Sequence, residues 1–200
     1  MDCKFAAAVE SMKPRSPSAQ TLVTRVVAIG DERYEVQLDG PLAPGWAGNL
    51  AAGLARVGVS IDRGHARGAG AGLWSARIEV VRTPCAADPR ALGIAKLATT
   101  DSGAGFATSI ELDHFALLPS LEHGGTLQLR LEAADTVGFL AALLRRLAYF
   151  ALFPVEMRLE TRSGRIADEF WLCAGGSRAP SPATADALRA VLRSLVRAKR

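Results

Sequence analysis

The sequence predicts an α+β fold in which one unit of strands and helices occurs twice in tandem. Short segments with alternating apolar and polar residues, typical of half-buried strands, are interspersed with segments whose apolar residues recur at helical spacing. Glycine-, proline- and aspartate-containing turns separate these segments. In addition, several positions recur at one fixed spacing in the two halves of the chain.

The composition is that of a globular protein. Of the 200 residues, 49% are apolar and 22% charged, which excludes collagen-like and disordered chains. The net charge of +4 is small and only 6% of the residues are aromatic, so we do not expect a nucleic acid as partner. The three cysteines, Cys3, Cys85 and Cys173, lack the paired spacing of a disulfide scaffold or a zinc site, and we expect neither a metal nor a cofactor.

Residues 1–20 are polar and contain two prolines, and they are predicted to form a flexible N-terminal arm. Their apolar run, Phe5–Val9, is too short for a signal peptide. The longest apolar run of the chain, Phe139–Val155, is interrupted by two arginines and is therefore not expected to span a membrane. A cytoplasmic protein without membrane contact is the expectation that follows.

The first domain is predicted over residues 21–120 and opens with a hairpin. Thr21–Ile29 is rich in β-branched residues, and Arg33–Leu38 alternates after a short Gly-Asp-Glu turn. A helix is expected to start at Pro44-Gly45, and its apolar residues include Leu50 and Leu54.

The rest of the first domain contains a glycine-rich segment, two strands and a helix. Arg63–Gly72 is interpreted as a mobile hairpin loop, or as one arm of a hairpin with a bulge, because it lacks the Lys-Ser/Thr of a phosphate-binding loop and a strand follows it. Leu73–Val81 is predicted to be that strand. A helix capped by Asp88 is expected to run to about Ala98, before a strand at Thr108–Leu118.

The second domain is predicted over residues 125–200, after the glycine pair 124–125. Thr126–Leu131 alternates as a strand, and Asp135 is a good N-cap for a helix that we expect Pro154 to terminate. A hairpin follows, with strands at Val155–Leu159 and Arg165–Ala174. Its turn is Ser163-Gly164. Ser181 caps the last helix, with proline at the first helical position.

The two domains share four positions at a spacing of 93 residues. The pairs are Gly45 and Gly138, Trp46 and Phe139, Leu50 and Leu143, and Leu54 and Leu147. In each copy the predicted order is strand, helix, strand, turn, strand, helix, which follows the β-α-β-β-α-β plan of ferredoxin-like domains. We therefore predict two ferredoxin-like domains, with antiparallel sheets and helices on one face. The last strand of the plan is missing after the final helix, and Thr21–Ile29 is a candidate for that edge.

A strand and a short loop, followed by glycine and an aromatic residue at the start of an apolar helix and then a hairpin, resemble an ACT domain. The second copy, with Asp135-Thr136-Val137-Gly138-Phe139-Leu140, is similar to the C-terminal ACT repeats of the bacterial uridylyltransferase that senses glutamine, where the motif reads D-R-P-G-L-L. The Arg and Pro of that motif are absent here. The first copy, from Gly40 to Trp46, departs further. The resemblance covers residues 33–198 and implies a tandem ACT-like protein.

The resemblance implies that an amino acid binds where two such domains pair. Its carboxylate would lie at the N–H groups of the helix start and its amino group at a nearby acid. The implied binding residues are the following: Asp39, Gly45, Trp46, Ala47, Asp135, Val137, Gly138 and Phe139. Simpler local roles are open for two of them, because Asp135 can cap its own helix and Asp39 can belong to a turn.

The sequence predicts a protein that is not an enzyme. Asp168 and Glu169 are neighbours in a strand, so their side chains point to opposite faces and make a poor acid–base pair. No nucleophile elbow accompanies the serines. The leading expectation is thus a regulatory protein that binds an amino acid and forms a homodimer or contacts a partner enzyme. The alternative is an assembly module without ligand.

Overall fold

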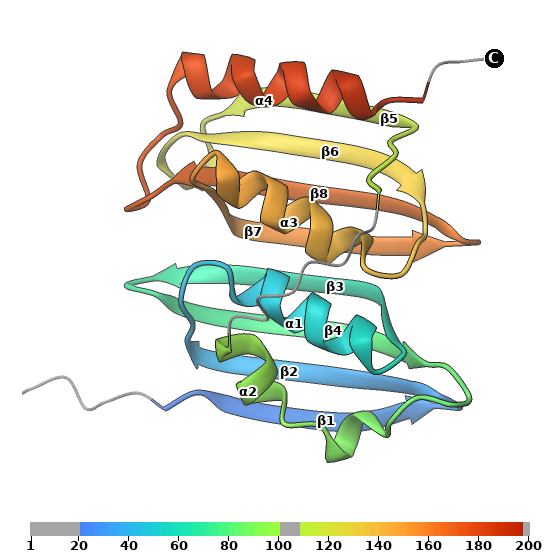
Figure 1. Cartoon of the computed structure of the whole chain (residues 1–200). Coiled ribbons are helices and arrows are strands. Elements are labelled where there is room, and N and C mark those ends of the chain that lie inside the picture. The colour runs from blue at the N-terminus through green and yellow to red at the C-terminus, as the bar shows by residue number, and fades with distance from the viewer. Residues whose placement is uncertain (1–20, 101–108, 198–200) are drawn as a thin grey trace, which may run out of the picture.

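The computed structural model describes residues 21–100 and 109–197. The predicted N-terminal arm, residues 1–20, lies outside the described residues, as does the start of the strand predicted at Thr108–Leu118. In the described part, eight strands form one antiparallel sheet in the order β1-β2-β4-β3-β7-β8-β6-β5 (Figure 1). No helix of this part is long and apolar enough to cross a membrane.

The N-terminal half of the sheet contains β1 (Val23–Gly30), β2 (Arg33–Pro41), β3 (Val59–Gly70) and β4 (Leu73–Arg82). Its helices are α1 (Trp46–Arg56), the short 3-10 helix η1 (Pro89–Ala91) and α2 (Ile94–Thr99). The C-terminal half contains β5 (His114–Ser120), β6 (Thr126–Ala134), β7 (Leu152–Arg162) and β8 (Arg165–Ala174). Its helices are the 3-10 helix η2 (Glu122–Gly124), α3 (Phe139–Tyr149) and α4 (Pro182–Leu195).

The structure confirms an α+β fold with an antiparallel sheet, and the strands of both halves belong to one sheet within the chain. Each half consists of two strands, a helix, two strands and a helix, so the extra strand precedes the unit instead of following it. The reason is local: β1 and β5 each form a hairpin with the next strand and thereby occupy the edge of their half. The last strand placed in the first domain, β5, pairs with β6 of the C-terminal half.

One strand pair joins the two halves. β3 and β7 are antiparallel, with Arg63 opposite Glu160, His65 opposite Arg158 and Arg67 opposite Glu156. In the 93-residue repeat, His65 corresponds to Arg158, which is also its partner in the ladder. Arg63 corresponds to Glu156 and Arg67 corresponds to Glu160, so the repeat interchanges the two outer pairs. The junction therefore has pseudo-twofold symmetry about its central pair. Opposite charges therefore face each other at both ends of this ladder, which favours this register.

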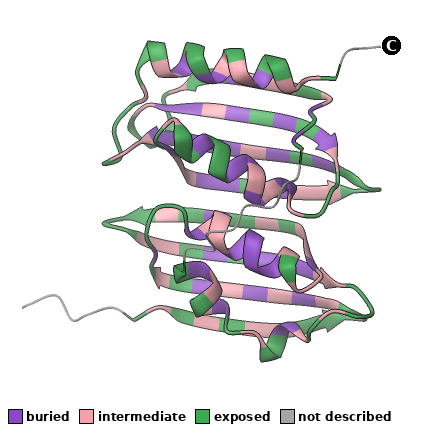
Figure 2. Ribbon diagram, viewed as in Figure 1, coloured by how far each residue is buried: buried purple, intermediate pink, exposed green. Residues whose placement is uncertain are grey.

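The core lies between the sheet and the helices. α1, α2, α3 and α4 contribute buried residues to one continuous cluster with one face of the sheet (Figure 2). Among them, Leu50, Leu54, Leu143 and Leu147, four members of the repeated pairs, are almost fully buried. The other face of the sheet, here called the open face, is rich in charged side chains such as Glu35, which is paired with Arg77 at 3.5 Å. This alternation gives each strand one apolar and one polar side.

Several predicted boundaries need correction. The interpretation of Arg63–Gly72 as a mobile loop is wrong: most of it is β3, an arm of a hairpin with bulges, which was the alternative. The helix predicted from Asp88 is divided, because Gly93 separates η1 from α2. Helix α3 ends at Tyr149, and Ala151 has a positive φ of 52°. Pro154 lies instead in β7. It is beyond Glu156, the last β7 residue that pairs with β3, so the N–H that proline lacks removes no hydrogen bond to β3.

Gly40 of β2 packs closely against the residues just before β1, and a substitution there tests this contact. This residue has a φ of +135°, and a Cβ added to it would lie 2.9 Å from Leu22 Cα and 3.0 Å from the Thr21 carbonyl oxygen. We expect Gly40→Ala to lower the free energy of unfolding by about 2 kcal/mol and Tm by roughly 5 °C. Thermal unfolding followed by circular dichroism measures this change. Gly175→Ala is the control, since a Cβ there meets nothing within 4 Å; equal Tm values for the two variants would contradict the explanation.

Candidate functional site

A small cavity lies where the two halves meet on the helix side of the sheet. We call it the junction pocket; it has a volume of about 50 Å³. The N-terminal half contributes residues of α1 and β3, and the C-terminal half contributes the β6–α3 loop, the first turn of α3, β7 and β8. Its lining includes the following residues: Ala51, Ala55, Ser60, Ile61, Asp135, Val137, Gly138, Phe139 and Asp168.

Asp168 is the most unusual residue of the junction pocket. It lies in β8 and is 6% exposed, and its Oδ1 accepts a hydrogen bond from the Glu160 N–H at 3.1 Å. Burial raises the pKa of Asp168 to about 7, with a smaller increase from the charge of Asp135; the Glu160 N–H acts in the opposite direction. The carboxyl group therefore changes its charge close to neutral pH.

Asp135, the first residue of the β6–α3 loop, is the second acid of this pocket. Its pKa is raised, mainly by burial and further by the charge of Asp62. The expectation that Asp135 caps α3 is wrong: the N-cap is Gly138, and no side chain caps this helix. Gly138 has a φ of 83°, a left-handed conformation that glycine adopts without strain. Asp135 of this loop, Asp168 of β8 and the uncapped start of α3 thus border one cavity.

A second cavity, the aromatic pocket, occupies the place related to the junction pocket by the 93-residue shift. It has a volume of about 30 Å³ and is lined by Gly45, Trp46, Ala47, Trp74 and Leu144, among others. Gly45 is the N-cap of α1, with a φ of 92°, as Gly138 is for α3. The rings of Trp46 and Trp74 meet edge to face at 5.3 Å. The repeated glycine therefore serves the same left-handed turn in both halves.

The two pockets differ in chemistry although their backbones correspond. Ala51, Ser60 and Ile61 of the junction pocket have Leu144, Phe153 and Pro154 as counterparts in the aromatic pocket. The place of Asp168, opposite Leu131, is taken by Ala76, opposite Leu38. Larger apolar side chains thus fill the aromatic pocket, and it has no carboxylate among its described lining residues.

The predicted binding residues consequently fall into three places. Asp135, Val137, Gly138 and Phe139 line the junction pocket. The first-copy residues at positions 45–47 line the aromatic pocket. Asp39 is exposed on β2 and borders a hollow of the open face together with His65 and Arg77, so it does not approach the start of α1.

Sequence reasoning missed Asp168 as a site residue. The expectation that Asp168 and Glu169 point to opposite faces is confirmed, because Glu169 receives a bond from Arg130 at 2.6 Å on the open face. The signal that identifies the inward-pointing acid is the alternation of the strand. Asp168 alternates with Ile166 and Phe170, both buried, so it occupies a core position of the strand.

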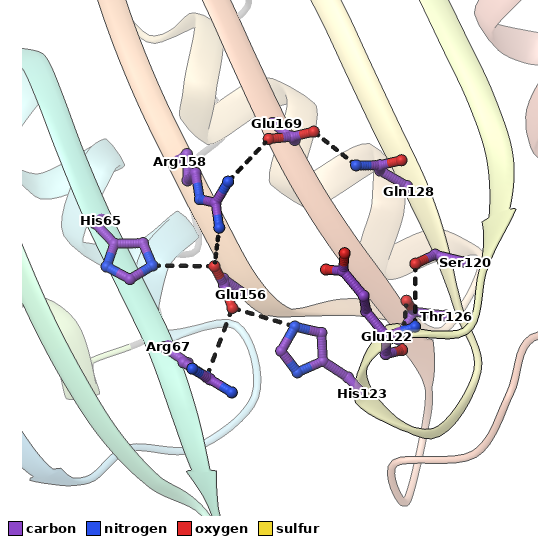
Figure 3. A network of polar contacts seen from close by, with 10 residues as sticks. All are labelled: His65, Arg67, Ser120, Glu122, His123, Thr126, Gln128, Glu156, Arg158 and Glu169. Carbon is purple, nitrogen blue, oxygen red and sulfur yellow. Dashed lines mark hydrogen bonds and ion pairs between the residues drawn. The ribbon is translucent and has the colours of Figure 1, made fainter.

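The open face carries a polar network centred on Glu156 (Figure 3). This side chain is 4% exposed, and its oxygens lie 3.1 Å from His65 Nε2, 3.1 Å from His123 Nε2 and 3.0 Å from Arg158 Nη2. Burial raises the pKa of Glu156, but the hydrogen bonds from His65 and Arg158 outweigh burial, and the pKa lies below its usual range. Basic side chains thus surround this carboxylate, and their contacts with it connect β3, β7 and the β5–β6 turn.

The Arg158 guanidinium lies 4.7 Å from the ring centre of Trp171, which is buried beneath it on β8. No group of three or more histidine, cysteine, aspartate or glutamate side chains among residues 21–100 and 109–197 has the arrangement of a metal site.

Comparison of the chain with models of protein families, with curated proteins and with solved structures gives no match in any of the three.

The burial of Asp168 predicts an unusual pH dependence of stability. Its pKa rises from about 3.8 in the unfolded chain to about 7 in the folded one, so the folded state binds the proton more tightly. The free energy of unfolding should fall as the pH rises from 4 to 7, by up to about 4 kcal/mol from this residue.

Asp168→Asn keeps an acceptor for the Glu160 N–H and removes the charge. Urea unfolding from pH 4 to pH 8 should show similar stability of both proteins at pH 4 and a more stable variant at pH 8. Parallel curves for the two proteins would contradict the assignment.

Proposed function

We propose that this chain is a non-catalytic regulatory protein that binds a small amino acid in the junction pocket. The observation that carries the proposal is a buried carboxyl group, Asp168, facing a cavity that also borders the uncapped start of α3. An α-amino acid has a cationic ammonium and an anionic carboxylate on one carbon. The ammonium would lie near Asp168 and Asp135, and the carboxylate near the first-turn N–H groups of α3.

The size of the junction pocket restricts the ligand. A cavity of about 50 Å³ accommodates about three to five water molecules, comparable to the ammonium, α-carbon and carboxylate of one amino acid. The small side chains of Ala51, Ala55 and Ala141 on the helices leave this space open. A larger ligand side chain would have to extend through the mouth, which the exposed Val137 borders.

The position of the pocket agrees with the resemblance described above. ACT-like domains are expected to bind their ligands where two domains pair, and the junction pocket takes residues from both halves. We extend the proposal to two ferredoxin-like units that share one sheet, each with its edge strand at the N-terminal instead of the C-terminal side. A ligand in this place would link the two halves and change their relative stability.

A thermal-shift panel of the twenty amino acids tests the proposal. A ligand present at 100 times its Kd should add about 2.7 kcal/mol to the free energy of unfolding. One small amino acid should raise Tm, and Ala51→Leu should abolish that rise, because Leu144 shows how leucine fills the corresponding place. Asp39→Asn, on the open face, is the matched control and should retain the response. A response that survives Ala51→Leu would place the ligand elsewhere.

Ligand binding should also depend on pH. If the ammonium binds the ionised form of Asp168, whose pKa is about 7, the affinity should be about tenfold lower at pH 6 than at pH 8. Isothermal titration calorimetry with the amino acid found in the panel measures this ratio. An affinity that is equal at both pH values would mean that Asp168 does not bind the ammonium.

A second candidate function is an assembly module without ligand. The aromatic pocket favours it, since one of the two corresponding positions holds large apolar side chains and no carboxylate. A flat amino-acid panel, together with a stable protein complex that ignores amino acids, would support this alternative over the sensor.

A further inference from the structure

The junction pocket is lined by hydrogen-bond acceptors and, in the described part of the chain, by no basic side chain. Asp135 and Asp168 contribute two carboxyl groups. Three hydroxyl groups accompany them, from Ser60, Thr136 and Thr161. Carboxylates and hydroxyls accept hydrogen bonds from a cation, whereas no lysine, arginine or histidine lines the described pocket to attract an anion. The lining therefore favours a positively charged group.

Asp168 has one carboxylate oxygen available for such a group. The side chain is 6% exposed, and its Oδ1 accepts the Glu160 N–H at 3.1 Å. Its Oδ2 has no hydrogen-bond partner among the described residues. Because burial of a carboxylate costs free energy unless donors satisfy it, a donor in the cavity would stabilise this oxygen. Asp168 is thus a buried acceptor that lines the pocket and lacks one of its partners.

The sheet is interrupted where it holds this carboxyl group. In β7, Leu159 and Glu160 have no partner on β8, although the residues on both sides of them are paired. The Glu160 N–H donates to the Asp168 side chain instead. In the other half, where Ala76 takes the place of Asp168, the corresponding ladder is continuous and Ala66 pairs with Ala76. The acid therefore replaces a backbone acceptor of the sheet, and this bond fixes the position of its Oδ1.

The start of the helix distinguishes the junction pocket from the aromatic pocket much less than the acids do. The Phe139 N–H of α3 donates to the Thr136 carbonyl at 3.0 Å, and the Trp46 N–H of α1 donates to the Ala43 carbonyl at 3.1 Å. The first N–H of each helix is therefore already bonded in the same way, which leaves fewer donors for a ligand carboxylate. The carboxyl groups occur in the junction pocket alone of these two.

Acidic charge also surrounds the mouth of the junction pocket. Asp135 lines the pocket and is itself exposed, and the negative charge of Asp62 acts on it. The basic residues next to Asp62 are Arg33 and Arg63, which pair with Asp62 and with Glu79, Arg63 at 3.8 and 3.3 Å. Their ion pairs are with these two acids and not with Asp135. The field at the mouth thus attracts small cations and repels anions.

We propose that the junction pocket selects its ligand by the ammonium group, so that small primary amines without a carboxylate bind there as well as amino acids do. This inference deepens the proposed function and rests on it, because it takes the junction pocket as the ligand site. The ammonium donates one N–H to Asp168 Oδ2 and its others to Asp135 and the hydroxyls of the lining. The carboxylate of an amino acid adds little, since the pocket offers it no basic side chain.

Three compounds of matched shape test the inference. In isobutylamine an isopropyl group takes the place of the carboxylate of glycine, and in propionate a methyl group takes the place of its ammonium. Thermal shifts of the full chain are measured in phosphate buffer at pH 8, above the pKa of about 7 of Asp168. Isobutylamine should raise Tm as much as glycine or more, and propionate should leave Tm unchanged. Potassium chloride at the same concentration is the control for ionic strength.

A pair of neighbouring acids supplies matched variants. Asp168→Asn should lower the affinity for isobutylamine about tenfold or more in calorimetric titrations at pH 8, because the charged acceptor is lost. Glu169→Gln changes the next residue of β8, whose side chain bonds Arg130 on the open face, and it should retain the wild-type affinity. Circular dichroism spectra establish that both variants are folded.

The outcomes separate this inference from the proposed function. A rise in Tm with an amino acid but not with isobutylamine would overturn the inference and leave the proposed function intact. A flat response to all twenty amino acids and to isobutylamine would overturn both. An equal rise with propionate or potassium chloride, or an isobutylamine affinity that Asp168→Asn leaves unchanged, would show that the ammonium is not recognised by Asp168.

Discussion

The pairing of β3 with β7 is the constraint on which the remaining structure depends. Five residues of each strand face each other there, and opposite charges lie at both ends of this ladder. The pairing turns two four-stranded units into one sheet and brings α1 beside α3. The small side chains of Ala51, Ala52 and Ala141 pack together between these helices. The junction pocket exists because this contact leaves space beside the β6–α3 loop.

Duplication of the backbone without duplication of the chemistry is the second feature of the molecule. Gly45 and Gly138 have the same left-handed conformation at the same place, because both loops must turn sharply into a helix that packs on the sheet. Around this turn the side chains have diverged. Asp168 occupies a core position that Ala76 occupies in the other half. One backbone hydrogen bond, from the Glu160 N–H, offsets part of the free-energy cost of burying its carboxyl group. A buried acid is unusual at such a packing position.

The open face shows how a sheet remains stable in water without a second layer. Glu156 is almost buried there, but four basic side chains surround it: His65, Arg67, His123 and Arg158. His123 comes from the β5–β6 turn and has a φ of 56°. The network therefore holds that turn against the sheet as well as linking the two halves. Its groups come from β3, β7 and a distant turn, so no local sequence motif reveals it.

The sequence by itself determined most strands and helices, the repeat of 93 residues and the separation of apolar and polar faces. These features depend on local preferences, such as the alternation in Thr126–Leu131 and the Ser181-Pro182 start of α4, which the structure reproduces. Tertiary structure alone decided that β1 and β5 lie at the edges, that the halves share one sheet, and that Asp135 lies near Asp168 while Asp39 lies on the opposite face. Those outcomes depend on which strands pair across long separations, and the free energy of such pairing arises from contacts between residues far apart in the chain.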